Sequence, residues 1–244
     1  MSPRKRKKSA VRLLLYGMNR KYLAFDIETA KTWPENEHDW KSHRPLGIAC
    51  AATLLADSTD GLVLWHGENR MSQQDAAALV HYLTTQVENG YTIVTWNGIG
   101  FDFDILAEES GMLAECRRLA VDHVDMMFHI LCQLGFGGRL DGAARGMGIV
   151  GKQMDGADAP KLWAEGQREK VLSYVAQDVR TTAEVATTCE ARRIFRWITR
   201  SGKARIMELP KGWLTVDEAE QLPEPDTSWM SDPWTRAKFT DWLR

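Results

Sequence analysis

One short stretch constrains the fold more than any other part of the chain. Residues 21–29 are Lys-Tyr-Leu-Ala-Phe-Asp-Ile-Glu-Thr, and their apolar, β-prone first half predicts a buried strand. Alternate side chains of a strand share a face, so we expect Asp26 and Glu28 side by side at its end. Two adjacent carboxylates resist joint ionisation unless a cation such as Mg²⁺ or Mn²⁺ neutralises them. The alternative for an isolated Asp-x-Glu pair is two solvated acids on an edge strand.

The remaining pattern predicts a mixed α/β sheet with helices packed on it. Further strands are predicted at residues 46–56, 62–66 and 91–95, the first two as an antiparallel hairpin. Helices are predicted at residues 72–88, 101–119, 126–134, 140–147 and 168–200. Ser72 with Asp75 is a variant of the capping box for the first helix, and Gly111 can interrupt the second.

Composition excludes some classes of function. The chain has 244 residues, 44% of them hydrophobic, which suits one globular domain plus tails. A net charge of -2 gives no bulk signal for nucleic-acid binding, so any such binding must come from local patches. Four scattered cysteines without a C-x-x-C pair indicate reduced core thiols in a cytoplasmic protein. The apolar run at residues 47–56 is too short to span a membrane.

Tails flank a predicted central domain at residues 20–200. Residues 1–19 form a basic arm that we expect to be flexible, and it either binds phosphates or serves as a solubilising tail. Residues 201–244 form an extension in which Asp232-Pro233 predicts the start of a short terminal helix. One face of that helix carries Phe239, Trp242 and Leu243. This face either docks on the chain's own domain or acts as a lid or partner contact.

Two further acids follow the first pair along the chain. Asp178 lies in an apolar stripe of the last predicted helix, four residues after Tyr174 and therefore on the same face. A buried unpaired carboxylate is costly, and a metal would explain Asp178, as would an arginine or a backbone amide. Asp102 follows the strand at residues 91–95, at a strand-to-helix junction of the kind where ligands gather in α/β sheets.

Three segments, in this order, resemble the exonuclease motifs of the DEDD superfamily. They are Phe-Asp-Ile-Glu-Thr at 25–29, Asn-Gly-Ile-Gly-Phe-Asp at 97–102 and Tyr-Val-Ala-Gln-Asp at 174–178. The tyrosine marks the DEDDy branch, which includes the 3′–5′ proofreading domains of family B DNA polymerases. The likeness extends to stand-alone PolB-like predicted 3′–5′ exonucleases, and it covers roughly residues 20–195. It implies an α/β, ribonuclease H-like mixed sheet, with antiparallel first strands and then parallel ones, flanked by helices.

The resemblance also implies roles for the acids. Asp26, Glu28 and Asp178 would hold one divalent cation, Mg²⁺ or Mn²⁺, and Asp26 would be shared with a second. Asp102 would steady the second cation, and Tyr174 would orient the attacking water. Two cations suit phosphodiester hydrolysis, which requires both an activated hydroxide and a stabilised leaving oxygen.

Some assignments within the motifs need a choice. The family spacing Asn-x-x-x-Phe-Asp selects Asp102, whereas Asp104 faces differently once a helix has begun. The sister branch uses a histidine at the position of Val175, which excludes that variant here. Asp125 opens a helix, and capping is its simpler interpretation.

Four residues are candidates for contacting the substrate. Thr29 closes the first motif, and Asn97 and Phe101 belong to the second. Phe101, and Trp96 just before Asn97, can stack on a terminal base, but core packing explains both aromatic residues equally well. Lys152 offers a point charge for a phosphate, or is simply a solvated lysine.

The leading hypothesis is a metal-dependent 3′–5′ exonuclease acting on single-stranded nucleic acid, with DNA favoured over RNA, and releasing nucleoside 5′-monophosphates. The expected partners are single-stranded 3′ ends and, acting beside the protein, a replication or repair polymerase. No membrane association is expected. A catalytically silent binding module of the same fold is the alternative from a different functional class, and an in-trans proofreading subunit is a third hypothesis.

Overall fold

The central feature is a five-stranded mixed sheet. The computed structural model describes residues 20–33, 39–150 and 158–244, so Lys152 and the basic arm lie outside the described residues. The strands are β1 (Tyr22–Thr29), β2 (Ile48–Leu55), β3 (Leu62–His66), β4 (Thr92–Thr95) and β5 (Val124–Asp125). Their order is β3-β2-β1-β4-β5; β1, β2 and β3 pair antiparallel, whereas β1–β4 and β4–β5 pair parallel. The predicted ribonuclease H-like arrangement of strands is confirmed.

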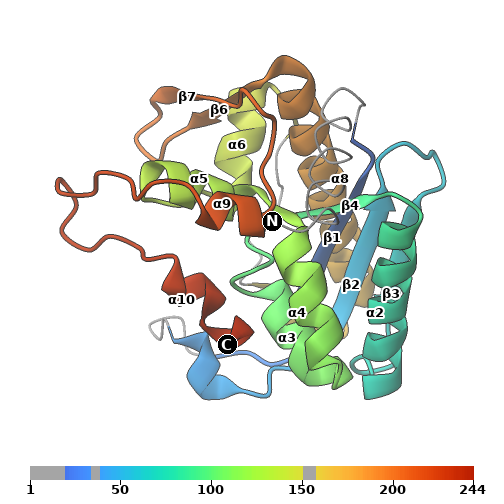
Figure 1. Ribbon diagram of the computed structural model, residues 1–244. Coiled ribbons are helices and arrows are strands. Elements are labelled where there is room, and N and C mark those ends of the chain that lie inside the picture. Colours follow the sequence, from blue (N-terminus) through green and yellow to red (C-terminus); the bar gives the residue numbers. More distant parts are fainter. Residues whose placement is uncertain (1–19, 34–38, 151–157) are drawn as a thin grey trace, which may run out of the picture.

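Helices cover both faces of this sheet (Figure 1). They are α2 (Gln73–Glu88), α3 (Asp102–Ser110), α4 (Leu113–Asp122), α5 (Met126–Leu134), α6 (Leu140–Met147), α7 (Ala159–Ala164), α8 (Arg168–Arg192), α9 (Val216–Glu220) and α10 (Ala237–Thr240). Short 3₁₀ turns are η2 (Trp40–His43) and η4 (Asp241–Leu243). Tyr22 and Ala24 of β1 enter the core that contains α6 and α8, whereas Leu23 and Phe25 enter the core with α2 and α3. Alternate residues of β1 therefore serve opposite cores.

Local signals in the sequence set several helix boundaries. The Ser72 hydroxyl accepts a hydrogen bond from the Asp75 amide, and the Asp75 carboxylate accepts one from the Ser72 amide, which completes the predicted capping box. Gly111, with φ +71°, ends α3 in the left-handed conformation that glycine adopts without strain. The predicted interruption between α3 and α4 is confirmed.

The prediction of one helix over residues 168–200 was wrong at its end. The helix α8 stops at Arg192 because Arg193 turns the chain with φ +54°. The next residues form β6 (Ile194–Ile198), which pairs antiparallel with β7 (Ala204–Glu208) in a separate two-stranded sheet. The alternating residues of β6 and the Ser-Gly turn after it are ordinary hairpin signals, and they override continued helical spacing.

The C-terminal helix also begins later than predicted. It starts at Ala237, so Asp232-Pro233 does not cap it. Phe239 lies 6.2 Å from Phe128, ring centroid to centroid, and Trp242 Nε1 donates a 2.7 Å hydrogen bond to the Ile99 carbonyl. The terminal segment is thus docked on the chain's own domain, the first of the two predicted alternatives, and it lies against the turn after β4.

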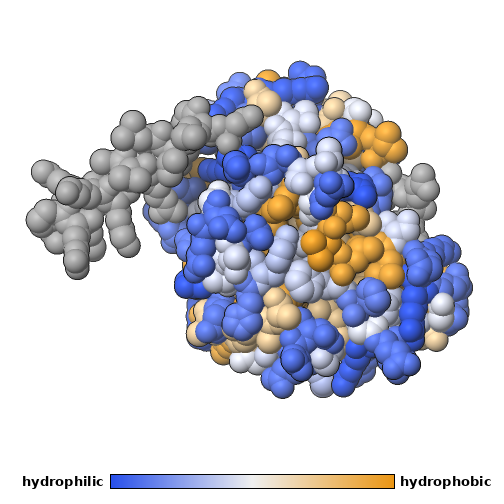
Figure 2. Space-filling view, turned by 90° about the vertical axis from the view of Figure 1, so that its right-hand side faces the viewer, coloured by the Kyte–Doolittle hydropathy of each residue, from blue (hydrophilic) through white to orange (hydrophobic). Residues whose placement is uncertain are grey.

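The surface and the cysteines agree with a globular domain. The side of the molecule that lies to the right in Figure 1 is mostly hydrophilic, and hydrophobic residues gather near its centre and toward the upper right (Figure 2). Within the part of the chain that the structure describes, every helix is too short or too polar to cross a membrane. The four cysteines are free and buried, as core thiols are expected to be.

Candidate metal centre

The first two acids lie together on β1, on the face that α8 covers. The antiparallel register with β2 shifts beside them, because Glu28 faces Cys50 while Thr29 faces Ile48. Such irregularities re-aim side chains and are frequent next to active sites. Burial raises the pKa of the Cys50 thiol, and the negative charges of Glu28 and Asp26 raise it further. The two carboxylates therefore create a negative potential that extends to the neighbouring strand.

A third carboxylate reaches them from α8. One oxygen each of Asp26, Glu28 and Asp178 lies within 4.8 Å of the others. Glu28 and Asp178 are buried, and Asp26 is half-buried. Like charges this close are mutually repulsive, and oxygen ligands are those that hard divalent cations prefer. The donor set therefore fits Mg²⁺ or Mn²⁺, and the sheet and the long helix hold it in place.

Tyr174 lies one helical turn before Asp178 and is also buried. Burial is the largest cause that raises the pKa of its hydroxyl, followed by the negative charges of Asp178, Glu28 and Asp26. The hydroxyl also hydrogen-bonds the Asp178 side chain. Tyr174 is therefore protonated at neutral pH, and it acts on the cluster as a hydrogen-bonding group.

Asp102 borders this cluster from the opposite core. It opens α3, is buried, and its Oδ1 accepts a 2.9 Å hydrogen bond from the amide of Ile27. Ile27 lies between Asp26 and Glu28 in β1, so Asp102 is fixed against the backbone that carries both acids. Within the described residues, the group of mutually close carboxylates comprises Asp26, Glu28 and Asp178, and Asp102 lies outside it.

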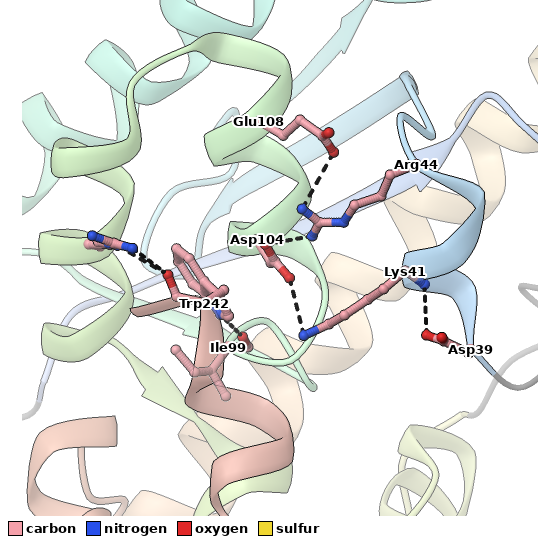
Figure 3. Close-up of polar contacts among 8 residues, drawn as sticks. Asp39, Lys41, Arg44, Ile99, Asp104, Glu108 and Trp242 are labelled. Carbon is pink, nitrogen blue, oxygen red and sulfur yellow. Dashed lines mark hydrogen bonds and ion pairs between the residues drawn. The ribbon is translucent and has the colours of Figure 1, made fainter. Parts of the chain in front are cut away.

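Asp104 is directed elsewhere (Figure 3). Its Oδ1 lies 2.5 Å from Arg44 Nη2, and its Oδ2 lies 3.7 Å from Lys41 Nζ. Both cations belong to η2 and the residue after it, and Arg44 also contacts Glu108 at 3.6 Å. Arg44 and Lys41 therefore balance the charge of Asp104 away from the cluster, whereas Asp102 hydrogen-bonds the backbone of β1.

Asp125 has a second role that the sequence did not reveal. It caps α5 by accepting from the Phe128 amide at 3.0 Å, as predicted. Its carboxylate also accepts from the amides of Asn97 at 3.0 Å and Ile99 at 2.9 Å. Burial raises its pKa to about 6, and these backbone hydrogen bonds oppose that shift. Asp125 therefore fixes the turn that leads to Asp102; only its position at the end of a short strand could have indicated this.

The candidate substrate residues lie around the same edge of the sheet. Thr29 is buried at the end of β1. Asn97 adopts φ +75°, and its Oδ1 is buried without a hydrogen-bond partner in the described part of the chain. Phe101 packs edge-on against Trp40 with ring centroids 5.1 Å apart. Lys152 belongs to the residues that the structure does not describe.

Comparisons with known proteins agree with this architecture. The family model RNase_H_2, described as RNase_H superfamily, matches residues 23–189. A solved family B DNA polymerase from the hyperthermophilic archaeon Pyrobaculum calidifontis is similar in fold, with 21% identity and a TM-score of 0.51. The similarity covers 70% of this chain and only 24% of the polymerase chain. No curated protein matches. Because the family model covers well over half of its length, the chain belongs to the RNase_H_2 family of the ribonuclease H superfamily.

Proposed function

We propose that the protein is a metal-dependent 3′–5′ exonuclease that hydrolyses phosphodiester bonds at the 3′ ends of single-stranded nucleic acid. The observation that carries the proposal is the convergence of Asp26, Glu28 and Asp178, with one oxygen of each within 4.8 Å of the others. DNA is the favoured substrate, and nucleoside 5′-monophosphates are the products. The 3′–5′ direction rests on the resemblance of the three motifs, and the similarity to a family B DNA polymerase supports the fold.

Each acid has a distinct part in this proposal. Asp26, Glu28 and Asp178 hold the first cation, Asp26 is shared with the second, and Asp102 steadies the second from its position against Ile27. When bound, the cations lower the pKa of the attacking water and stabilise the leaving oxygen. The protein supplies fixed, partly desolvated ligands, because β1 and α8 are both part of the buried core.

Tyr174 and the turn after β4 position the other reactants. Because Tyr174 stays protonated, its hydroxyl orients the attacking water and does not remove the water's proton. Thr29, Asn97 and Phe101 lie around the end of β1 and β4, where they can contact the terminal nucleotide. Lys152 is proposed as a further phosphate contact from outside the described residues.

A degradation assay tests the activity. With Mg²⁺ or Mn²⁺, the protein should shorten a 5′-labelled single-stranded oligonucleotide stepwise, and matched DNA and RNA oligonucleotides report the preferred substrate. Asp26→Asn and Asp178→Asn should each lower the rate by at least about a hundredfold, since ligand loss should exceed the effect of losing an outer-shell partner. Asp122→Asn makes the same chemical change at an exposed site on α4 and should retain activity. If the oligonucleotide stays intact with Mg²⁺ and also with Mn²⁺, the proposal is refuted.

A metal titration tests the site without depending on turnover. Mn²⁺ binding, followed by electron paramagnetic resonance, should weaken in Glu28→Gln and Asp178→Asn and stay unchanged in Asp122→Asn. Equal Mn²⁺ affinity in all these proteins would show that the cluster is not the metal site. Thermal melting of each variant separates loss of binding from loss of fold.

A further inference from the structure

A groove of about 440 Å³ lies between α6, the β6–β7 hairpin and the segment that precedes α10. Its lining includes Trp96, Phe136, Arg139, Trp197, Arg200 and Trp234. Figure 1 shows the hairpin and the segment between α9 and α10 together on the left of the molecule. The hairpin and Trp234 follow residue 189, so they lie beyond the region that the family model matches. The groove therefore joins residues of the matched region, such as Trp96 and Phe136, to a wall that lies outside it.

Aromatic rings form much of the groove. Phe195 and Trp197 of β6 are stacked with centroids 5.3 Å apart and an interplanar angle of 10°. The ring centroids of Phe136 and Trp197 lie 6.3 Å apart. The Trp234 side chain, on the segment before α10, is 42% exposed. Phe195 is buried, but accessible faces such as those of Trp197 and Trp234 can bind nucleic-acid bases by stacking, whatever the base, because every base has a π-face.

Positive charge accompanies the rings. Residues 194–208 hold four cations (Arg196, Arg200, Lys203 and Arg205) and one acid (Glu208), in a chain whose net charge is -2. Arg145 of the lining is balanced by Asp141 at 2.9 Å, and the other cations in the lining are Arg139 and, from the hairpin, Arg200. Arginines at the groove beside aromatic faces match the phosphates and bases of a single strand.

One lining residue of the groove, Trp96, follows the strand that pairs with β1. Val94 of β4 pairs with Ala24 of β1, so Trp96 and Asp26 each follow that pair by two residues. Trp96 lies just beyond the end of β4 and packs against both cores, including the one that contains α8. Trp96 Nε1 donates a 3.0 Å hydrogen bond to the Gly138 carbonyl, which joins the end of β4 to the wall of the groove.

We propose that this groove binds the single strand upstream of the 3′ end that occupies the carboxylate cluster. The inference rests on the proposed function for its direction, but the groove's affinity for single strands can be measured without it. The hairpin is held close to α6 because Gly146 and Gly142 approach the backbone of β6. The hairpin wall of the groove is therefore held in place before a nucleic-acid strand binds, and binding does not have to order that wall.

Binding is measured without cleavage by fluorescence anisotropy of 5′-fluorescein-labelled dT12 in EDTA. Trp234→Ala should raise the Kd about fivefold or more, as loss of a stacked base does. Arg200→Glu, at the exposed hairpin turn, should also weaken binding and make the plot of log K against log salt shallower by about 0.7 or more. Arg118→Glu, which makes the same charge change on exposed α4, should bind like the wild type.

Cleavage separates the two proposals. With Mn²⁺, Trp234→Ala and Arg200→Glu should cut a thymidine dinucleotide as the wild type does and lose efficiency only on dT12. If the two variants bind dT12 more weakly but the wild-type protein cleaves neither substrate, the groove proposal stands and the exonuclease proposal is refuted. Wild-type affinity in both variants, or a wild-type protein that does not bind dT12, would overturn the groove even if the exonuclease is active. Thermal melting verifies that each variant is folded.

Discussion

Asp104 carries a charge that the fold has to balance. Its side chain is 5% exposed, and Arg44 at 2.5 Å and Lys41 at 3.7 Å supply the counter-charges. Burying an ion pair contributes little net stability, but removal of one partner leaves the other charge uncompensated. The pair therefore determines where η2 lies against α3, and it keeps Asp104 away from the metal ligands.

Arg44→Ala should lower the free energy of unfolding by about 2–3 kcal/mol, below the range of about 3–5 kcal/mol for fully buried pairs. The cost is reduced because the Arg44 side chain is 27% exposed and Lys41 remains. Urea denaturation measures the change, with Arg118→Ala as an exposed control. Mn²⁺ affinity should not change, and a loss of Mn²⁺ binding would mean that Asp104 belongs to the metal site.

Tyr174→Phe removes only the hydroxyl that faces Asp178. We expect kcat to fall by about one to two orders of magnitude, at or below the lower end of the range for groups that transfer a proton, because the hydroxyl only orients the water. Mn²⁺ affinity should stay close to the wild-type value because the three carboxylates remain. An unaltered rate constant for cleavage in single-turnover assays would show that Tyr174 does not orient the water.

At the scale of elements, α6 approaches β6 unusually closely. A Cβ atom on Gly146 would lie 2.3 Å from the Trp197 Cα and 2.4 Å from the Arg196 carbonyl oxygen. These are backbone neighbours, which cannot move aside as a flexible side chain can. The helix and the hairpin can pack in this way only because position 146 has no side chain.

Gly146→Ala should therefore lower Tm and loosen the hairpin, although alanine has the higher helix propensity. We expect a cost of about 1–3 kcal/mol, as for other overpacked sites. Gly138→Ala is the control, because its Cβ would meet only Trp96 Cζ2 at 4.0 Å. Amide hydrogen exchange of residues 194–208 locates the effect, and unchanged protection there would contradict the expected separation of α6 from β6.

At the scale of the whole molecule, two buried histidines make stability depend on pH. Burial lowers the pKa of His123 and of His129 to about 4. The His129 Nδ1 accepts a hydrogen bond from the Leu214 amide, which requires the neutral ring. The unfolded chain has histidine pKa values of about 6.5, so between about pH 6.5 and 4 it binds protons that the folded chain does not.

Stability should therefore fall as the pH is lowered from about 6.5 towards 4, by on the order of 3 kcal/mol for each histidine. Asp125 opposes part of this loss below about pH 6, because its raised pKa makes the folded state the better proton acceptor there. Urea denaturation across this range gives the slope. His129→Asn should reduce it and the exposed His66→Asn should not; a wild-type slope in His129→Asn would contradict the assignment.

The sequence determined the elements whose signals are local. Period-two spacing placed Asp26 and Glu28 on one face, and helical spacing placed Tyr174 with Asp178. The capping box at Ser72 likewise depends on residues close in the chain. Helical spacing gave the wrong end for α8, because a positive φ at Arg193 ends the helix and the hairpin signals that follow override that spacing.

Only the tertiary structure decided what each acid contacts. Asp102 and Asp104 differ by two positions in one helix, yet the first meets the Ile27 amide and the second meets Arg44. Likewise, the local pattern predicts that Asp125 caps α5, and only the fold brings the Asn97 amide to the same carboxylate. The physical reason is that spacing fixes the direction of a side chain relative to its own element. The charges and donors that it meets come from distant segments, and the packing of the two cores brings these together.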